Sequence, residues 1–128
     1  MTYQRILRSV SDPLRGRIAR GRLVRLFEMQ GGACYYCLRE SWLPEIEPMD
    51  TFAARHGISW QDVAKFRMAT REHLIKRQDG GTNQIFNVVM ACAWCNNQRG
   101  DRSVLDHVKF CRQHFYGQSL AAFTAFGG

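Results

Sequence analysis

Apolar side chains recur at helical spacing near the beginning of the chain. The residues that share this face are Ala19, Leu23, Leu26 and Phe27. Asp12 followed by Pro13 is typical of a helix start, and Gly31-Gly32 is typical of a helix end. We therefore expect one helix within residues 1–32, with a single apolar face turned toward the protein core.

A second helix is expected near the other end, over residues 103–116. Ser103 with Asp106 three residues later is a pattern typical of a helix start. The apolar stripe that follows consists of Val104, Val108, Cys111 and Phe115, which is helical spacing. The place of Cys111 in this stripe favours a buried structural thiol over a metal ligand.

Residues 38–67 have the pattern of a helical insertion. Two short helices, 51–56 and 59–66, are expected on either side of Gly57, with Ser59 as the N-cap of the second. Helix pairs joined by a glycine turn are common in small domains. A faint likeness to a helix-turn-helix therefore leaves open whether the insertion contacts DNA.

Strand-like patterns are confined to the segment 68–101. The stretch RMATREHLI is rich in apolar and β-branched residues, which favours a strand. The cluster Asp79-Gly80-Gly81 predicts a turn, and the β-prone stretch Ile85 to Ala91, with Asn87 inside it, predicts the returning strand. The pattern indicates an antiparallel pair of strands flanked by helices, which is an α+β arrangement.

The size of the chain limits what it can be. With 128 residues and 45% apolar content, it has the length of one domain and can bury a modest core. No apolar stretch is long enough to span a membrane, and the N-terminal residues include no apolar signal segment. We therefore expect a cytoplasmic protein with no membrane partner.

Four of the five cysteines form two CxxC pairs, Cys34 with Cys37 and Cys92 with Cys95. Disulfides are disfavoured in the cytoplasm, so the pairs indicate one structural zinc ion in a closed tetrahedron of four thiolates. The 54 residues between the pairs exceed what a compact zinc ribbon needs, so the hairpin and the insertion must fit between them. A redox dithiol is the alternative, although it does not explain a second pair.

Positive charge is concentrated near the N-terminus. The formal net charge is +7, the 18 basic residues include 15 arginines, and seven of these lie in the first 30 residues. Arginine binds phosphate oxygens in pairs, so a polyanion such as double-stranded DNA is the expected partner. The candidate phosphate contacts are Arg17, Arg22 and Arg25, and the alternative is an ordinary solvated helix face.

The order of chemical groups resembles the HNH endonuclease family, whose shared unit is two strands and a helix around one metal ion, the ββα-metal fold. The resemblance extends from residue 20 to residue 106. It rests on CYYC at 34–37, REH at 71–73, the Gly80-Gly81 pair, Asn87, ACAWCN at 91–96 and Arg99-Gly100-Asp101. The chain departs from the family at Glu72, where Asp is common, and at Lys76, where Pro is common.

This resemblance implies one α+β domain over residues 1–128, a small zinc-stabilised ββα-metal (HNH) domain with flanking helices. Its expected parts are a basic helical arm (1–32), the helical insertion (38–67), the ββα-metal core (68–101) and a C-terminal helix (103–116).

The resemblance also implies a metal-dependent DNA endonuclease. His73 would be the general base that activates water, a role that suits imidazole because it titrates near neutral pH. Glu72 and Asn96 would hold the catalytic ion, and their hard oxygen atoms favour Mg²⁺ or Mn²⁺. Asn87 would fix the loop and orient the His73 ring, while Arg99 could contact a phosphate. Water attack with the 3′ oxygen as leaving group would give 5′-phosphate and 3′-hydroxyl ends.

Two other interpretations remain open. A zinc-stabilised DNA-binding module without catalysis would carry the same cysteines and arginines. It differs from the enzyme in whether a metal ion reaches Glu72 and Asn96. A protein-interaction zinc domain is disfavoured by the arginine-rich N-terminal segment.

Overall fold

The computed structural model describes residues 13–84 and 86–117, with side chains described from residue 19 onward. Two expectations therefore lie outside the described residues. They are the helix start at Asp12 and the phosphate contact of the Arg17 side chain.

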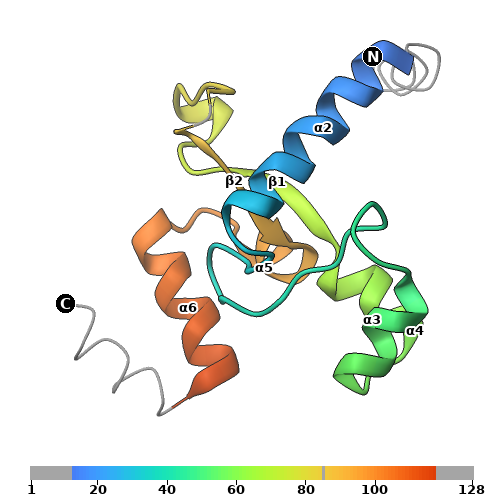
Figure 1. Cartoon of the computed structure of the whole chain (residues 1–128). Helices are drawn as coiled ribbons and strands as arrows, with labels where there is room; N and C mark the ends of the chain where they lie inside the picture. The colour runs from blue at the N-terminus through green and yellow to red at the C-terminus, as the bar shows by residue number, and fades with distance from the viewer. Residues whose placement is uncertain (1–12, 85, 118–128) are drawn as a thin grey trace.

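The described part consists of helices around one antiparallel hairpin (Figure 1). In chain order the elements are α2 (Pro13–Met29), α3 (Met49–His56), α4 (Trp60–Asp62), the π-helical turn η1 (Val63–Arg67), β1 (Ala69–His73), the 3-10 turn η2 (Arg77–Asp79), β2 (Val88–Cys92), α5 (Ala93–Gln98) and α6 (Val104–Tyr116). The predicted α+β class is confirmed, and β1, β2 and α5 form the ββα unit.

The hairpin is shorter on its return strand than the sequence suggested. His73, the last residue of β1, lies opposite Val88, the first residue of β2. The return strand was expected over 85–91 with Asn87 inside it, but Asn87 precedes the strand. Its main-chain oxygen still accepts a hydrogen bond from the N–H of Leu74 (2.8 Å). The Asn87 side chain binds the loop instead, which ends the regular ladder.

The two faces of the hairpin contact different helices. On one face, a buried cluster consists of Leu23, Leu26 and Phe27 of α2 with Leu43, Ala69, Val88 and Met90. Residues directly opposite one another share a face, so Arg71 and His73 lie on this α2 side. Successive side chains alternate along a strand, so Thr70 and Glu72 lie on the other face, toward α5. Glu72 and His73 are therefore neighbours in sequence that point to opposite sides of β1.

The insertion forms a small core of its own. Its buried residues are Trp42, Phe52, Ala53 and Val63. Ser59 caps α4 as expected, because its side chain accepts a hydrogen bond from the N–H of Asp62 (3.1 Å). The second helix was expected to run to Phe66, but α-helical geometry ends at Asp62 and a π-helical turn continues to Arg67. The Arg67 guanidinium donates to the main-chain oxygen of Glu40 (2.7 Å), which fixes this end of the insertion.

Helix α6 packs against the end of the hairpin that carries the cysteines. Ser103 caps it, as the sequence predicted, by accepting from the N–H of Asp106 (3.2 Å). Cys111 is fully buried in the same cluster as the four paired cysteines. Within residues 13–84 and 86–117, no helix combines the length and the apolar character needed to cross a membrane.

Candidate metal and catalytic site

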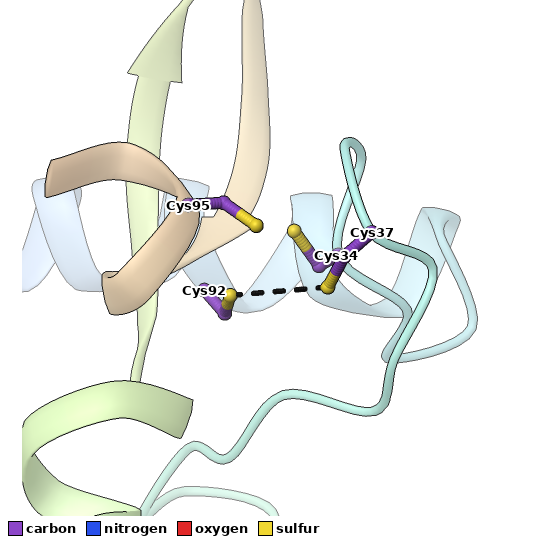
Figure 2. A group of neighbouring side chains, drawn as sticks. All are labelled: Cys34, Cys37, Cys92 and Cys95. Atoms are coloured by element: carbon purple, nitrogen blue, oxygen red, sulfur yellow. Dashed lines mark hydrogen bonds between the residues drawn. The ribbon is translucent and has the colours of Figure 1, made fainter. Parts of the chain in front are cut away.

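Four buried cysteines meet beside the start of α5 (Figure 2). Cys34 and Cys37 come from the loop after α2, Cys92 ends β2, and Cys95 lies in the first turn of α5. Their four sulfur atoms lie within 4.8 Å of one another, and the Sγ atoms of Cys37 and Cys92 are 4.0 Å apart. Zn–S bonds of about 2.3 Å in a tetrahedron require sulfur atoms roughly 3.8 Å apart. The cluster therefore fits a zinc ion, and four thiolate ligands would leave that ion no open position, which is typical of a structural site.

The first cysteine pair lies in a tight knuckle that is closed by main-chain hydrogen bonds. The N–H of Cys34 donates to the oxygen of Arg39, and the N–H of Leu38 donates to the oxygen of Cys34 (both 2.9 Å). Leu38 has a φ of 66° at this turn. The N–H of Tyr35 donates to the oxygen of Met90 (3.0 Å), which joins the knuckle to β2. These bonds bring the two halves of the zinc site together.

Asn96 follows the second cysteine pair and is held against β1. Its Nδ2 donates to Thr70 Oγ1 (2.9 Å) and to the main-chain oxygen of Arg71 (3.1 Å). The Thr70 hydroxyl donates its proton to the main-chain oxygen of Ala91 (2.7 Å), so it can only accept from Asn96. This network fixes the orientation of the amide. Asn96 Oδ1 is left without a hydrogen-bond donor among the described residues.

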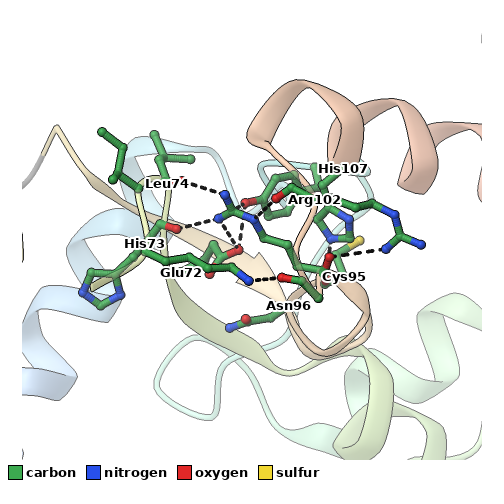
Figure 3. A network of polar contacts seen from close by, with 12 residues as sticks. Glu72, His73, Leu74, Cys95, Asn96, Arg102 and His107 are labelled. Atoms are coloured by element: carbon green, nitrogen blue, oxygen red, sulfur yellow. Dashed lines mark hydrogen bonds and ion pairs between the residues drawn. The ribbon is translucent and has the colours of Figure 1, made fainter. Parts of the chain in front are cut away.

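Glu72 lies on the same face of β1 as Thr70, and it is buried and paired (Figure 3). Its Oε2 accepts hydrogen bonds from the Tyr36 hydroxyl (2.8 Å) and from Arg99 Nη1 (3.1 Å). Its Oε1 accepts no hydrogen bond within the described part of the chain. One carboxylate oxygen therefore anchors the side chain, and the other remains available as a ligand.

The expectation that Arg99 contacts a phosphate is wrong for this structure. The Arg99 guanidinium is buried and donates to the main-chain oxygens of His73 (2.6 Å), Leu74 (2.7 Å) and Arg102 (3.0 Å), in addition to Glu72. Each of its nitrogen atoms is engaged inside the protein. A phosphate could reach it only if these bonds broke.

Tyr36 connects the zinc knuckle with this network. It lies between the two cysteines of the first pair and is fully buried. Burial, together with the hydrogen bond to Glu72, raises the pKa of Tyr36 above its usual value. Its hydroxyl therefore stays protonated and donates to the Glu72 carboxylate.

His73 is partly exposed at the end of β1, on the side of the strand opposite to Glu72. Its Nε2 lies 2.7 Å from Asn83 Oδ1. In the tautomer in which Nε2 donates to Asn83, Nδ1 carries the free lone pair and can accept a proton. The neighbour that orients the ring is thus Asn83, whereas the sequence suggested Asn87.

Asn87 holds the loop between the two strands from inside. Its Oδ1 accepts from the N–H of Ile75 (2.8 Å), and its Nδ2 donates to the oxygens of Ile75 (3.1 Å) and Thr82 (2.7 Å). The loop fastened in this way carries Asn83. Asn87 therefore acts on the His73 ring only through the position of Asn83.

Several residues of this site were not found from the sequence. Tyr36 was passed over because only its position between two cysteines singles it out, and Asn83 because one polar residue after a glycine pair is common in loops. His107 had no evident partner, yet it is fully buried with its Nε2 2.6 Å from the oxygen of Cys95. Burial lowers the pKa of His107, so the ring is held neutral. Its helical spacing from Cys111 in the sequence was the signal that could have placed it inside.

A comparison with family models agrees with this geometry. Residues 57–102 match the family model described as HNH endonuclease. The matched range contains β1, β2 and α5, and among the polar residues described above it contains Glu72, His73, Asn83, Asn87, Asn96 and Arg99. This segment therefore carries the sequence features of the HNH endonuclease domain. No curated protein and no solved structure gives a significant match to the chain.

The HNH segment, residues 57–102, includes only the second cysteine pair. Cys34 and Cys37 lie outside it, so the four-cysteine cluster joins the HNH segment to the N-terminal knuckle. The match to this family model supports a nuclease or DNA-binding function that involves metal ions.

Proposed function

We propose that this protein is a metal-dependent DNA endonuclease that hydrolyses phosphodiester bonds with a water molecule activated by His73. The observation that supports this most directly is the fixed amide of Asn96, whose unpaired Oδ1 belongs to the same face of β1 as Glu72. Thr70, which holds Asn96, and Glu72 are two residues apart on this face, which is roughly 6.6 Å along a strand. The Glu72 side chain is long enough to reach an ion shared with Asn96.

The donor atoms suit a hard divalent ion. Oε1 of Glu72 and Oδ1 of Asn96 are oxygen ligands, and Mg²⁺ is usually held by one or two protein oxygens while it keeps several waters. Mn²⁺ accepts the same ligands. When bound, the ion supplies charge stabilisation for the scissile phosphate and the leaving 3′ oxygen. Arg99 contributes by holding Oε2, so that Oε1 is the oxygen left to bind.

His73 would remove a proton from the attacking water through Nδ1. Asn83 holds the ring by its Nε2, so the imidazole does not have to reorient when it accepts the proton. Attack by water with the 3′ oxygen as leaving group would give 5′-phosphate and 3′-hydroxyl ends. The substrate is proposed to be double-stranded DNA, with exposed Arg22 and Arg25 of α2 as phosphate contacts.

The proposal is tested with supercoiled plasmid in the presence of Mg²⁺ or Mn²⁺. We expect His73→Ala to lower the cleavage rate by about 10²- to 10⁴-fold, the usual contribution of a general base, with zinc content and DNA affinity unchanged. Asn96→Ala should also cleave poorly, but a higher Mg²⁺ or Mn²⁺ concentration should partly restore its activity. Glu72→Ala is a poor probe because it would also leave Arg99 buried without its partner.

Asn97→Ala provides the matched control for Asn96→Ala. Asn97 is exposed and makes no side-chain hydrogen bond within the described part of the chain. The Asn97→Ala variant should cleave DNA at the wild-type rate. Rescue of His73→Ala by added metal, or products with 3′-phosphate ends, would contradict the assigned roles.

A second candidate is a zinc-stabilised DNA-binding module without catalysis. The buried pair of Glu72 and Arg99 favours it, because a carboxylate that already has a structural partner does not need a metal ion to explain it. In that case the wild-type protein would bind DNA and leave the plasmid intact with either divalent ion.

A further inference from the structure

A pocket of about 480 Å³ lies between α2 and the hairpin, on the face of β1 that carries His73. Its polar lining residues are Arg22 and Arg25 of α2, Arg71 of β1, and Asn83 and Gln84 of the loop. Leu26 and Val88 supply an apolar wall. None of the described lining residues is acidic.

The three arginine side chains of this pocket are not neutralised by any residue that the structure describes. None of the guanidinium groups of Arg22, Arg25 and Arg71 forms a hydrogen bond or an ion pair with another described residue. Arg20, on the same helix, shows the contrast, because its guanidinium donates twice to the Glu45 carboxylate (2.8 and 2.5 Å). Three uncompensated guanidinium groups around one concave site attract an anion, and planar guanidinium groups suit phosphate oxygens.

The pocket lies close to the proposed cleavage site. Arg71 and His73 are two residues apart on one face of β1, which is roughly 6.6 Å along the strand. Asn83 lines the pocket and also holds the His73 ring. One strand of duplex DNA advances about 3.4 Å along the axis for each phosphate. A strand that places its scissile bond at His73 therefore has a phosphate one or two nucleotides away at the level of Arg71.

We infer that this arginine pocket binds a backbone phosphate of the DNA strand that is cut, one or two nucleotides from the scissile bond. The inference rests on the proposed function, because it takes His73 as the place of cleavage. It adds Arg71, a residue of the catalytic strand itself, to the DNA contacts of α2. The two elements would hold the strand from both sides, with the apolar wall against the sugar.

The test is the salt dependence of DNA binding, measured by fluorescence anisotropy with a labelled duplex and without added Mg²⁺ or Mn²⁺. Each phosphate contact contributes about 0.9 to the slope of log K against log salt for duplex DNA. We expect Arg71→Gln to reduce the slope by about 0.9 and to weaken binding at low salt. Arg71→Lys should keep most of the slope, because lysine retains the charge.

Two further variants make the result specific. Arg22→Gln lies on the exposed face of α2, where a substitution does not threaten folding, and should lower the slope in the same way. Lys109→Gln removes one charge from the exposed face of α6, away from the pocket, and should leave the slope unchanged. An equal effect of Lys109→Gln would mean that net charge alone matters.

The outcomes separate this inference from the proposed function. If the wild type binds and cuts DNA while Arg71→Gln and Arg22→Gln keep its slope, the pocket inference is wrong and the endonuclease proposal stands. If the wild type binds no DNA, both are wrong. Inorganic phosphate, titrated without DNA, identifies a third case. Tight binding of phosphate that Arg71→Gln abolishes, without any change in the DNA slope, would assign the pocket to a free anion.

Discussion

Arg99 joins parts of the site that are far apart in the sequence. It pairs with Glu72, donates to main-chain oxygens at the end of β1 and lies 3.2 Å from the Tyr36 hydroxyl. Glu72 is only 8% exposed, so without Arg99 its carboxylate would be buried beside a single hydroxyl donor. Removing one partner of a buried ion pair is far more costly than removing an exposed one, because the remaining charge stays desolvated.

We therefore expect Arg99→Met to lower the free energy of unfolding by about 3–5 kcal/mol. The measurement is denaturant unfolding with zinc held constant. Arg77→Met is the matched control, because Arg77 is exposed and its side chain has no partner among the described residues. It should change stability by no more than about 0.5 kcal/mol. A loss for Arg99→Met as small as that of the control would show that the pair does not stabilise the fold.

At the scale of residues, the sequence indicated the chemical groups better than their directions. The succession of Glu72, His73 and Asn96 was visible, and strand alternation explains why the first two point to opposite sides of β1. The burial of Arg99 was not visible. A charged residue in a short polar stretch is normally exposed. Most acceptors of the Arg99 guanidinium lie at the end of β1 or just after it, 25 or more residues earlier in the sequence.

The loop between β1 and β2 is the element that positions His73, and side chains rather than regular structure hold it. Asn87 is 4% exposed and makes three hydrogen bonds across the loop. The glycine pair is also required locally. Gly80 has a φ of 91°, and a Cβ on Gly81 would collide with the main-chain oxygen of Ile75.

We expect Asn87→Ala to destabilise this loop and to slow DNA cleavage, because Asn83 would no longer be held beside His73. The loss of stability should be about 1–3 kcal/mol, since a partly buried main-chain donor loses its acceptor. Hydrogen exchange gives the sharper test. The amide of Ile75 should lose protection, while that of Leu74 should keep it, because Leu74 donates to the main-chain oxygen of residue 87. Unchanged exchange at Ile75 would contradict this role.

At the scale of elements, local patterns were predicted well and boundaries set by distant contacts were not. Ser59 and Ser103 cap helices where the sequence placed them, because a cap involves residues within one turn. The start of β2 was placed three residues early. It depends on the Asn87 side chain, whose partner Ile75 lies 12 residues away in sequence. No local sequence pattern predicted the π-helical turn from Val63 to Arg67 either.

At the scale of the whole molecule, the described residues form three small buried clusters in place of one continuous core. The cysteine cluster contacts the N-terminal knuckle, the hairpin and α6. The two CxxC pairs and their long separation were visible in the sequence, and the four sulfur atoms do meet. The sequence could not show that α6 would pack around them, because an apolar stripe does not specify its partner. Because the four cysteines lie where the knuckle, the hairpin and α6 meet, we expect these parts to fold together only when zinc is bound.

We expect Cys92→Ser to abolish folding as well as activity. Structural zinc contributes roughly 10–16 kcal/mol to small zinc domains at neutral pH, while domains of ordinary size are stable by only about 5–15 kcal/mol. Loss of the ion should thus unfold the chain, which circular dichroism would detect. Cys111→Ala is the control, because Cys111 is equally buried but its sulfur faces His107 (3.4 Å) and it is no member of the four-cysteine group. That variant should fold and retain one zinc per chain by elemental analysis. A folded, zinc-free Cys92→Ser protein would show that packing alone joins the knuckle to the hairpin.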